Sequence, residues 1–209
     1  MKITRISEIR RQELRQAAFE VLQTEGMASA TIEKVALKAG ASKGIVLHYF
    51  KTKQRLFEHA MRYANVLLRD EVIRLMRLAR GPEERLWAII DGNFRTEFFK
   101  PEICHAWLVL CAEIPREPQL ARIQRVVHAR MRSNLMSALS ALVPSDQREA
   151  IVLGITTLID GLWLRLGLRP GDVSAPEALA QMVDYLDHRI PQIEWRDHLR
   201  RTARGTESI

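Results

Sequence analysis

Residues 31–53 read TIEKVALKAGASKGIVLHYFKTK, and this stretch determines the fold expected for the first part of the chain. Thr31 can cap a short helix that Gly40 ends, because a threonine hydroxyl accepts free backbone N–H groups and glycine tolerates a left-handed backbone. Ser42 can then cap a second helix that runs to about Tyr49. Two short helices joined by a tight turn predict a helix-turn-helix, whose second helix can enter the major groove of DNA.

Within the second helix of this motif, the apolar and polar positions suggest which side is buried. Ile45 and Val46 are expected to be buried, while Lys43, Leu47 and His48 are among the positions expected to face outward. Such an outward face is what a recognition helix needs in order to reach base edges.

The rest of the chain also indicates helices. Apolar residues recur at helical spacing almost everywhere, and no Asn-Gly or Asp-Gly hairpin lies between alternating runs. The sequence therefore predicts an all-α protein of about nine helices, with a DNA-binding lobe over residues 1–62 and a larger lobe over residues 63–209. A helix that begins near Lys53 meets no strong breaker before residues 81–82, so it is expected to extend ~38 Å and to connect the lobes. Residues 193–209 are expected to form a mobile polar tail.

The charge of the chain is concentrated in the first lobe. Residues 1–62 contain 12 Lys+Arg and 6 Asp+Glu, a net charge of +6; the remaining residues contain 20 and 19, a net charge of +1, which together give +7. A basic lobe joined to a nearly neutral one predicts that the first binds a polyanion. The alternative is a basic face that is only solvated.

Several other classes of protein are disfavoured. Cys104 and Cys111 fit neither a disulfide framework nor a zinc site, so no metal or cofactor is expected. The six histidines include no HExxH pair, and there is no GxSxG or phosphate-binding glycine loop, which argues against an enzyme. The N-terminus has no apolar run typical of a signal peptide, and the apolar window 150–168 contains Asp160 and Arg165, which would be costly in lipid. A cytoplasmic protein with no membrane partner is expected.

A wider signature surrounds the opening motif. The segments Ala30-Thr31-Ile32, Val35-Ala36, residues 39–44 and residues 49–56 resemble the N-terminal signature of the TetR family of bacterial repressors, and the resemblance covers roughly residues 7–60. It implies that the motif binds double-stranded, palindromic operator DNA as half of a homodimer and that the larger lobe senses a small molecule. By this resemblance, the DNA-contacting positions are Thr31, Ser42, Lys43, His48, Tyr49 and Lys53, with Gly44 and Leu47 on the same outward face.

Two positions of the motif have more than one interpretation. The family commonly has a tyrosine where this chain has Leu47, so an apolar base contact, for example to a thymine methyl group, is expected in place of a phosphate contact. Tyr49 can be a core residue or can reach a phosphate with its hydroxyl, and Phe50 is expected to be a core residue.

The last two long helices, expected over residues 146–168 and 175–190, are predicted to form the dimer interface. The first is apolar on more faces than one neighbouring helix can cover. Pairing of both with their symmetry mates would build a four-helix interface and would place two recognition helices about one DNA turn apart. The expected interface residues are Ile151, Ile155, Leu158, Leu162, Leu166, Met182 and Leu186.

Three of the four tryptophans, Trp87, Trp107 and Trp163, lie in the second lobe. Trp163 follows Asp160 by three residues, so both are expected on one helical face. An aromatic wall beside an acid can bind a quaternary ammonium ion, because a ring face attracts a diffuse cation. The alternative is that these tryptophans are only core residues.

A second resemblance points to the same kind of effector. Gly92-Asn93-Phe94, Ala106-Trp107-Leu108 and above all residues 158–165 resemble BetI-type repressors, the TetR branch that controls the conversion of choline to glycine betaine. This implies repression that choline relieves. Leu110 and Cys111 occupy positions where aromatic residues are expected in that branch, so a choline derivative or another amine remains open, as does a regulator of efflux or catabolic genes. The residues expected to bind the effector are Trp87, Asn93, Phe94, Trp107, Cys111, Asp160 and Trp163.

Overall fold

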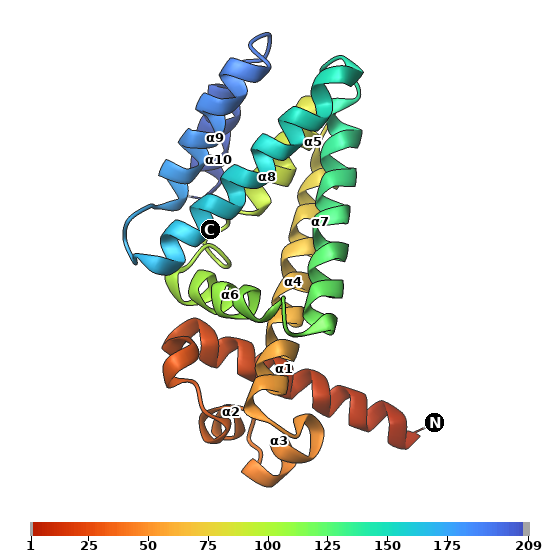
Figure 1. Ribbon diagram of the computed structural model, residues 1–209, viewed down its shortest axis with the longest axis vertical. Helices are drawn as coiled ribbons and strands as arrows, with labels where there is room; N and C mark the ends of the chain where they lie inside the picture. Colours follow the sequence, from red (N-terminus) through yellow and green to blue (C-terminus); the bar gives the residue numbers. More distant parts are fainter. Residues whose placement is uncertain (1, 207–209) are drawn as a thin grey trace.

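The computed structural model describes residues 2–206, and the side chains of residues 6–202. This part of the chain consists of ten helices and contains no strand, which confirms the all-α prediction. Figure 1 shows α1, α2, α3 and the start of α4 at one end of the molecule, with the remaining helices above them. The helices are α1 (Lys2–Ser29), α2 (Ile32–Lys38), α3 (Lys43–Phe50), α4 (Lys53–Leu78), α5 (Pro82–Gly92), α6 (Pro101–Glu113), α7 (Pro118–Leu139), α8 (Ser145–Leu168), α9 (Ala175–Arg189) and α10 (Trp195–Thr206).

The helix-turn-helix forms as its capping residues predict. The hydroxyl of Thr31 accepts the backbone N–H of Lys34 at 3.2 Å, and that of Ser42 accepts the N–H of Ile45 at 3.3 Å. Gly40 adopts a φ of 55° in the turn, where a residue with a side chain would be strained. These local contacts define the ends of both helices.

One side of α3 faces the small core. Val46 and Phe50 are 1% and 3% exposed, whereas Ile45 is 39% exposed. The prediction that Ile45 is buried is therefore wrong. Positions 46 and 50 lie four residues apart and share one face of the helix, and this face is the one that α3 turns inward.

The long helix α4 belongs to both lobes. It has 26 residues, so it is about 39 Å long, and Thr52 caps it by accepting the N–H of Arg55. Leu56 and Phe57 are buried near its beginning, and Val72 packs on Gly92 of α5 further along. A displacement of α4 in the upper lobe would therefore be transmitted to the small lobe.

The tenth helix replaces part of the expected tail. α10 covers residues 195–206, so the prediction of a mobile tail is wrong there, and residues 207–209 lie outside the described residues. Trp195 is fully buried and its indole N–H donates to the carbonyl of Ile190 at 3.1 Å. His198 lies near the rings of both Trp195 and Trp87. Trp195, His198 and Thr202 share one helical face, a periodicity that could have indicated this helix.

α8 is the one helix within residues 2–206 that is long and apolar enough, by length and composition alone, to cross a membrane. Within the fold it packs against α6, α7 and α9, with Ile155, Ile159 and Leu162 buried. Its place in the core of the upper lobe therefore explains part of its apolar composition, since 44% of its most apolar window is buried.

Gly167 allows α6 and α8 to lie close together. A Cβ atom at this position would lie 2.8 Å from the carbonyl carbon of Cys104 and 2.8 Å from Cδ1 of Leu108. We expect Gly167→Ala to push these helices apart and to lower the free energy of unfolding by ~1–3 kcal/mol. Denaturant unfolding would measure this change. Gly81→Ala, at an extended position outside the outward surface of α8 where an added Cβ meets no atom within 4 Å, is the control; equal midpoints for both variants would contradict the steric argument.

Candidate DNA-binding surface and effector chambers

The outward face of α3 is basic and open. Ser42, Lys43, Gly44 and His48 are exposed, and Leu47 is half-buried. Figure 1 places α3 at the outer end of the small lobe, where no other helix covers it. The predicted DNA-contacting residues of this helix therefore lie together on one surface.

Lys43 is held loosely in the absence of DNA. Its ammonium group forms an ion pair with Glu33 of α2, and both side chains are more than half exposed. Ion pairs of this kind contribute little to stability, so Lys43 can exchange Glu33 for a phosphate at small cost. Lys53, at the start of α4, is also exposed and lies 5.7 Å from the ring of Phe57.

The two aromatic residues that end α3 differ in their exposure. Tyr49 is half-buried, and the guanidinium of Arg11 lies 5.8 Å from the centre of its ring. Phe50 is buried and packs edge-on against His59, as expected for a core residue. Arg10 donates to the carbonyl of Gly40 at 3.2 Å, so α1 also braces the turn of the motif.

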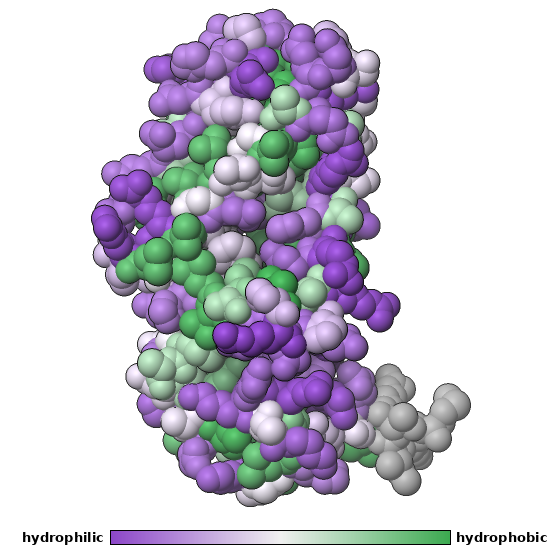
Figure 2. Space-filling view, viewed as in Figure 1, coloured by the Kyte–Doolittle hydropathy of each residue, from purple (hydrophilic) through white to green (hydrophobic). Residues whose placement is uncertain are grey.

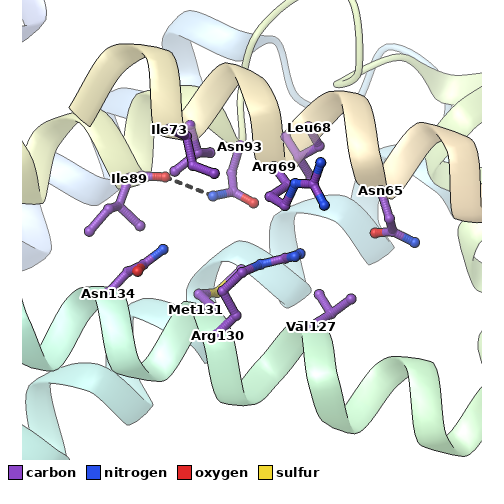
Figure 3. A pocket seen from close by; sticks show the side chains of 11 residues that line it. Asn65, Leu68, Arg69, Ile73, Ile89, Asn93, Val127, Arg130, Met131 and Asn134 are labelled. Atoms are coloured by element: carbon purple, nitrogen blue, oxygen red, sulfur yellow. Dashed lines mark hydrogen bonds between the residues drawn. The ribbon is translucent and has the colours of Figure 1, made fainter. Parts of the chain in front are cut away.

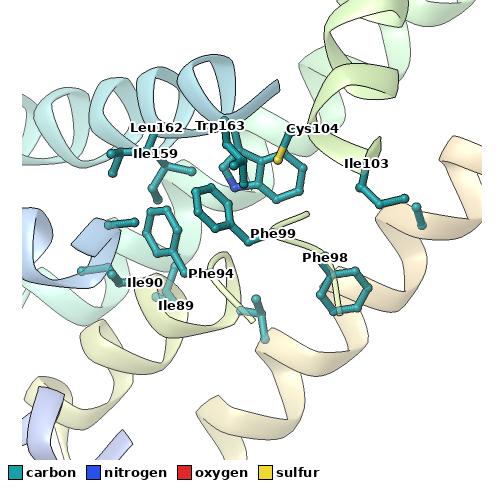
Figure 4. Packing of buried hydrophobic residues seen from close by; sticks show 14 of the residues in the cluster. Ile89, Ile90, Phe94, Phe98, Phe99, Ile103, Cys104, Ile159, Leu162 and Trp163 are labelled. Atoms are coloured by element: carbon teal, nitrogen blue, oxygen red, sulfur yellow. The ribbon is translucent and has the colours of Figure 1, made fainter. Parts of the chain in front are cut away.

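In the upper lobe, the predicted effector residues do not form a single wall. Phe94 and Trp163 are almost fully buried on either side of Phe99 (Figure 4). The indole N–H of Trp163 donates to the backbone carbonyl of Asn93 at 3.0 Å. Trp107 meets the edge of Trp163 at 5.9 Å between ring centres and is only half-buried. Of these rings, Trp107 is the one that reaches a cavity.

Trp87 belongs to another part of the lobe. Its indole N–H donates to the hydroxyl of Thr202 at 2.9 Å, and its ring lies 6.0 Å from that of His198. Trp87 thus attaches α5 to α10 and does not join Trp107 and Trp163, contrary to the sequence-based prediction.

Two small chambers lie along α4, each with a volume of about 40 Å³. The α5 chamber, between α4, α5 and α7, has Asn65, Asn93, Arg69 and Arg130 among its lining residues. Figure 3 shows Arg69 and Arg130 extending into the space between α4 and α7, and the amide of Asn93 donating to the carbonyl of Ile89.

The α6 chamber lies between α4, α6 and α7, nearer the small lobe. Glu58, Arg62 and Asn65 of α4 line it, together with Trp107 and Cys111 of α6. Asn65 borders both chambers, so they are neighbours along α4. Each has room for roughly three water molecules.

Both lobes match known protein families. Residues 14–60 match the family described as bacterial regulatory proteins of the tetR family, and residues 82–191 match the BetI-type transcriptional repressor C-terminal family. The chain belongs to the BetI-type branch of the TetR family. It is therefore a transcriptional regulator and not an enzyme. Like other members, it binds operator DNA, dimerises and binds a small-molecule effector.

Curated BetI regulators are similar over most of their length. The chain is 38% identical to that of Serratia proteamaculans over 184 residues, which is 87% of this chain and 93% of the relative. It is 35% identical to that of Rhizobium meliloti, with 86% and 88% of the two chains covered. Among solved structures, a transcriptional regulator from Saccharomonospora viridis in complex with choline has a TM-score of 0.74 at 17% identity, with 86% and 96% covered. This last similarity shows the fold.

Most of the residues predicted to form the dimer interface are buried within the single BetI-type chain. Six of them are at most 9% exposed within one chain, so the prediction is wrong for these six: a partner cannot cover side chains that the chain itself already covers. Leu158 is half-buried and stays a predicted interface residue. The exposed residues of α8 form a different stripe, with leucines that are 68%, 44% and 64% exposed at positions 153, 164 and 168. The six residues that the chain itself buries are Ile151, Ile155, Leu162, Leu166, Met182 and Leu186. The outward stripe consists of Leu153, Thr157, Gly161, Leu164 and Leu168.

Asp160 faces Cys111 and His128, and it is not among the lining residues of either chamber. Burial raises the pKa of Asp160, and the nearby His128 partly offsets this. Burial, with a smaller contribution from Asp160, raises the pKa of Cys111 to about 11. Both groups therefore favour their neutral forms more than exposed groups would.

Asp160→Asn is expected to stabilise the protein at neutral pH. Because the folded-state pKa of Asp160 lies above its unfolded value, the stability of the wild-type protein falls as pH rises between these two values. The variant does not lose this stability, so its melting temperature at pH 7 should be higher than that of the wild type. The two proteins should converge as pH is lowered towards ~4. Thermal melts across this pH range would measure the difference in melting temperature between the two proteins. A difference that grows as the pH is lowered would contradict a raised pKa for Asp160.

The sequence interpretation missed Phe99 and the polar residues of α4 that line the chambers. Glu58, Met61, Asn65 and Leu68 recur at three- and four-residue steps along the face of α4 that borders the chambers. An acid and an amide within an otherwise apolar stripe were a detectable signal, because charged residues are seldom buried without a partner.

Proposed function

We propose that this regulator represses genes for the conversion of choline to glycine betaine, and that choline or a related quaternary amine releases it from its operator. The observation that carries this proposal is the match of residues 82–191, which supply the chamber walls other than α4, to the BetI-type C-terminal family. The names of the curated relatives and the choline complex of the S. viridis regulator support the same effector class.

In this proposal the two lobes have separate tasks. Residues 1–62 bind the operator through the outward face of α3, with Lys43 and Lys53 on phosphates and Leu47 near a base edge. Residues 63–209 bind the second subunit and form most of the effector site, and the α6 chamber extends this site to Glu58 and Arg62 of α4. The protein acts in the cytoplasm, where its DNA target lies.

The dimer forms through the outward stripe of α8. Leu153, Leu164 and Leu168 are exposed leucines on one helical face, with Thr157 and Gly161 between them. Figure 2 shows hydrophobic residues on the face that α8 crosses in Figure 1. Gly161 has open space around it, so a second helix can approach closely there. A two-fold axis through this stripe would pair α8 with its symmetry mate.

Release of the operator follows from a shift in the equilibrium between two forms of the protein. Chambers of about 40 Å³ are too small for a molecule of choline's size, so the effector favours a form in which α4 has moved away from its neighbours. Because α4 carries the small lobe, that form spaces the two recognition helices differently. The effector therefore lowers operator affinity by as much as the operator lowers effector affinity.

A gel-shift titration tests this function. A palindromic operator near the gene should be bound at low salt, and choline added to the complex should release it. Retention of the operator at saturating choline, together with release by another amine found in a thermal-shift screen, would favour the alternative of a regulator that senses a different cation. No thermal shift with any amine would favour a DNA-binding protein without an effector.

A further inference from the structure

Glu58 is a mostly buried residue whose acid group has no partner among the described side chains. It is 5% exposed and follows the buried residues Leu56 and Phe57 near the start of α4. Among the residues whose side chains are described, none donates a hydrogen bond to its carboxylate or forms an ion pair with it. Its oxygens are not among the fully buried side-chain atoms that lack a hydrogen-bond partner, so the carboxylate keeps accessible surface while the rest of the residue is covered. An unpaired acid in such a position is available to a ligand of opposite charge.

The surroundings of Glu58 indicate what would bind. It lines the α6 chamber, where the other walls are mainly apolar and include the indole of Trp107. An anion would be repelled by the carboxylate, and a metal ion would need further oxygen or nitrogen ligands. An organic cation with a diffuse charge suits both an acid and an aromatic ring, because it needs no directed hydrogen bonds.

Arg62 provides a second polar group that a ligand in the α6 chamber can contact. It lies one turn after Glu58 and lines the same chamber, yet the two side chains form no ion pair. The Nε atom of Arg62 is buried and has no hydrogen-bond partner among the described residues. A ligand that carries an oxygen as well as a cationic group could use both residues at once.

We propose that Glu58 is the counter-ion of the effector's quaternary ammonium group, which binds in the α6 chamber against Trp107, while Arg62 donates to an oxygen of the same ligand. This rests on the proposed function, since it names where the amine binds. It assigns to Glu58 the role that the sequence suggested for Asp160, which lines neither chamber.

This location couples the effector directly to the DNA-binding lobe. Glu58 follows Lys53 by five residues on the same helix, so a ligand held by Glu58 contacts the first turns of α4. The α6 chamber must widen to accept it, which moves α4 relative to Trp107 and Cys111 of α6. The effect of the ligand therefore reaches the DNA-binding lobe through α4 itself.

The test is a calorimetric titration of choline into the full-length wild-type protein and three variants. Glu58→Gln keeps the shape of the side chain and removes its charge, and it should weaken choline binding at least about tenfold. Glu113→Gln removes a charge from the exposed end of α6, outside the chamber, and should change the affinity less than about threefold. Asp160→Asn tests the rival acid. The neutral carbon analogue 3,3-dimethylbutan-1-ol should bind wild type more weakly than choline, and it should not discriminate between wild type and Glu58→Gln.

The outcomes separate this inference from the proposed function. Loss of binding in Glu58→Gln with an unchanged or higher melting temperature supports the counter-ion, since removing a charge that pairs with no described side chain does not destabilise the fold. Wild-type affinity in Glu58→Gln, or loss in Asp160→Asn alone, overturns the inference and leaves choline-dependent release intact. If the wild-type protein binds neither choline nor any other quaternary amine, both the effector class and the inference fail.

Discussion

Replacing Leu164 by glutamate is expected to convert the regulator into a monomer and to weaken operator binding by at least ~100-fold. Leu164 is 44% exposed and lies within the outward stripe of α8. In a two-fold interface every residue appears twice, so the change brings two carboxylates into an apolar contact. Like charges in such a position cost several kcal/mol. A monomer contacts one half-site, so it loses the gain in operator affinity that comes from linking two DNA-binding lobes.

Light scattering would measure the mass of the Leu164→Glu variant, and a gel shift would measure its affinity for the operator. Leu78→Glu is the matched control, because Leu78 is 66% exposed at the end of α4 and is not part of the α8 stripe. It should remain dimeric and bind the operator normally. A dimeric Leu164→Glu variant would show that another surface forms the interface.

The residues predicted for the dimer interface show where sequence periodicity reaches its limit. Ile155 and Leu164 both belong to an apolar helix, and spacing alone predicts that this helix has more than one apolar face. Which face the chain covers for itself depends on where α6, α7 and α9 lie, and these are contacts between distant segments. The structure leaves Leu164 exposed and Ile155 fully buried. The helices of the DNA-binding lobe were predictable because their ends depend on local hydrogen bonds from Thr31, Ser42 and Thr52.

The proposed effector site shares only two residues with the set expected from the sequence. Trp107 and Cys111 were identified, and both line the α6 chamber. Trp87 was grouped with them only because it is a tryptophan in the same lobe. Glu58 was missed because it lies in the segment that the DNA-binding motif had already explained, and an acid there was counted as part of the surface charge. Burial of a single charge is a property of the tertiary structure.

Reversing the charge of Lys43 is expected to weaken operator binding on the order of 100-fold at moderate salt, because an acid would face a phosphate. Lys43 is exposed at the first position of α3, next to the cap Ser42. In a dimer the change removes two phosphate contacts. The slope of log K against log salt concentration should therefore become shallower by about 2.

Fluorescence anisotropy at several salt concentrations would measure both quantities for Lys43→Glu. Lys38→Glu is the control, since it makes the same change in net charge at an exposed residue of α2 that pairs with Glu20. It should lower the affinity less than about tenfold and leave the slope nearly unchanged. If Lys38→Glu weakens binding as much as Lys43→Glu, the lobe attracts the operator only through its overall positive charge and Lys43 makes no specific contact.

A double variant separates a DNA contact from a role inside the protein. Glu33→Lys with Lys43→Glu restores the ion pair between α2 and α3 with the charges exchanged. If Lys43 served only to hold these helices together, the double variant would recover operator binding. Because a surface pair of this kind contributes little to stability, we expect no recovery while the melting temperature stays near that of the wild type. Recovery of binding would show that the ion pair orients α3, and that the phosphate contact must come from another residue such as Lys53.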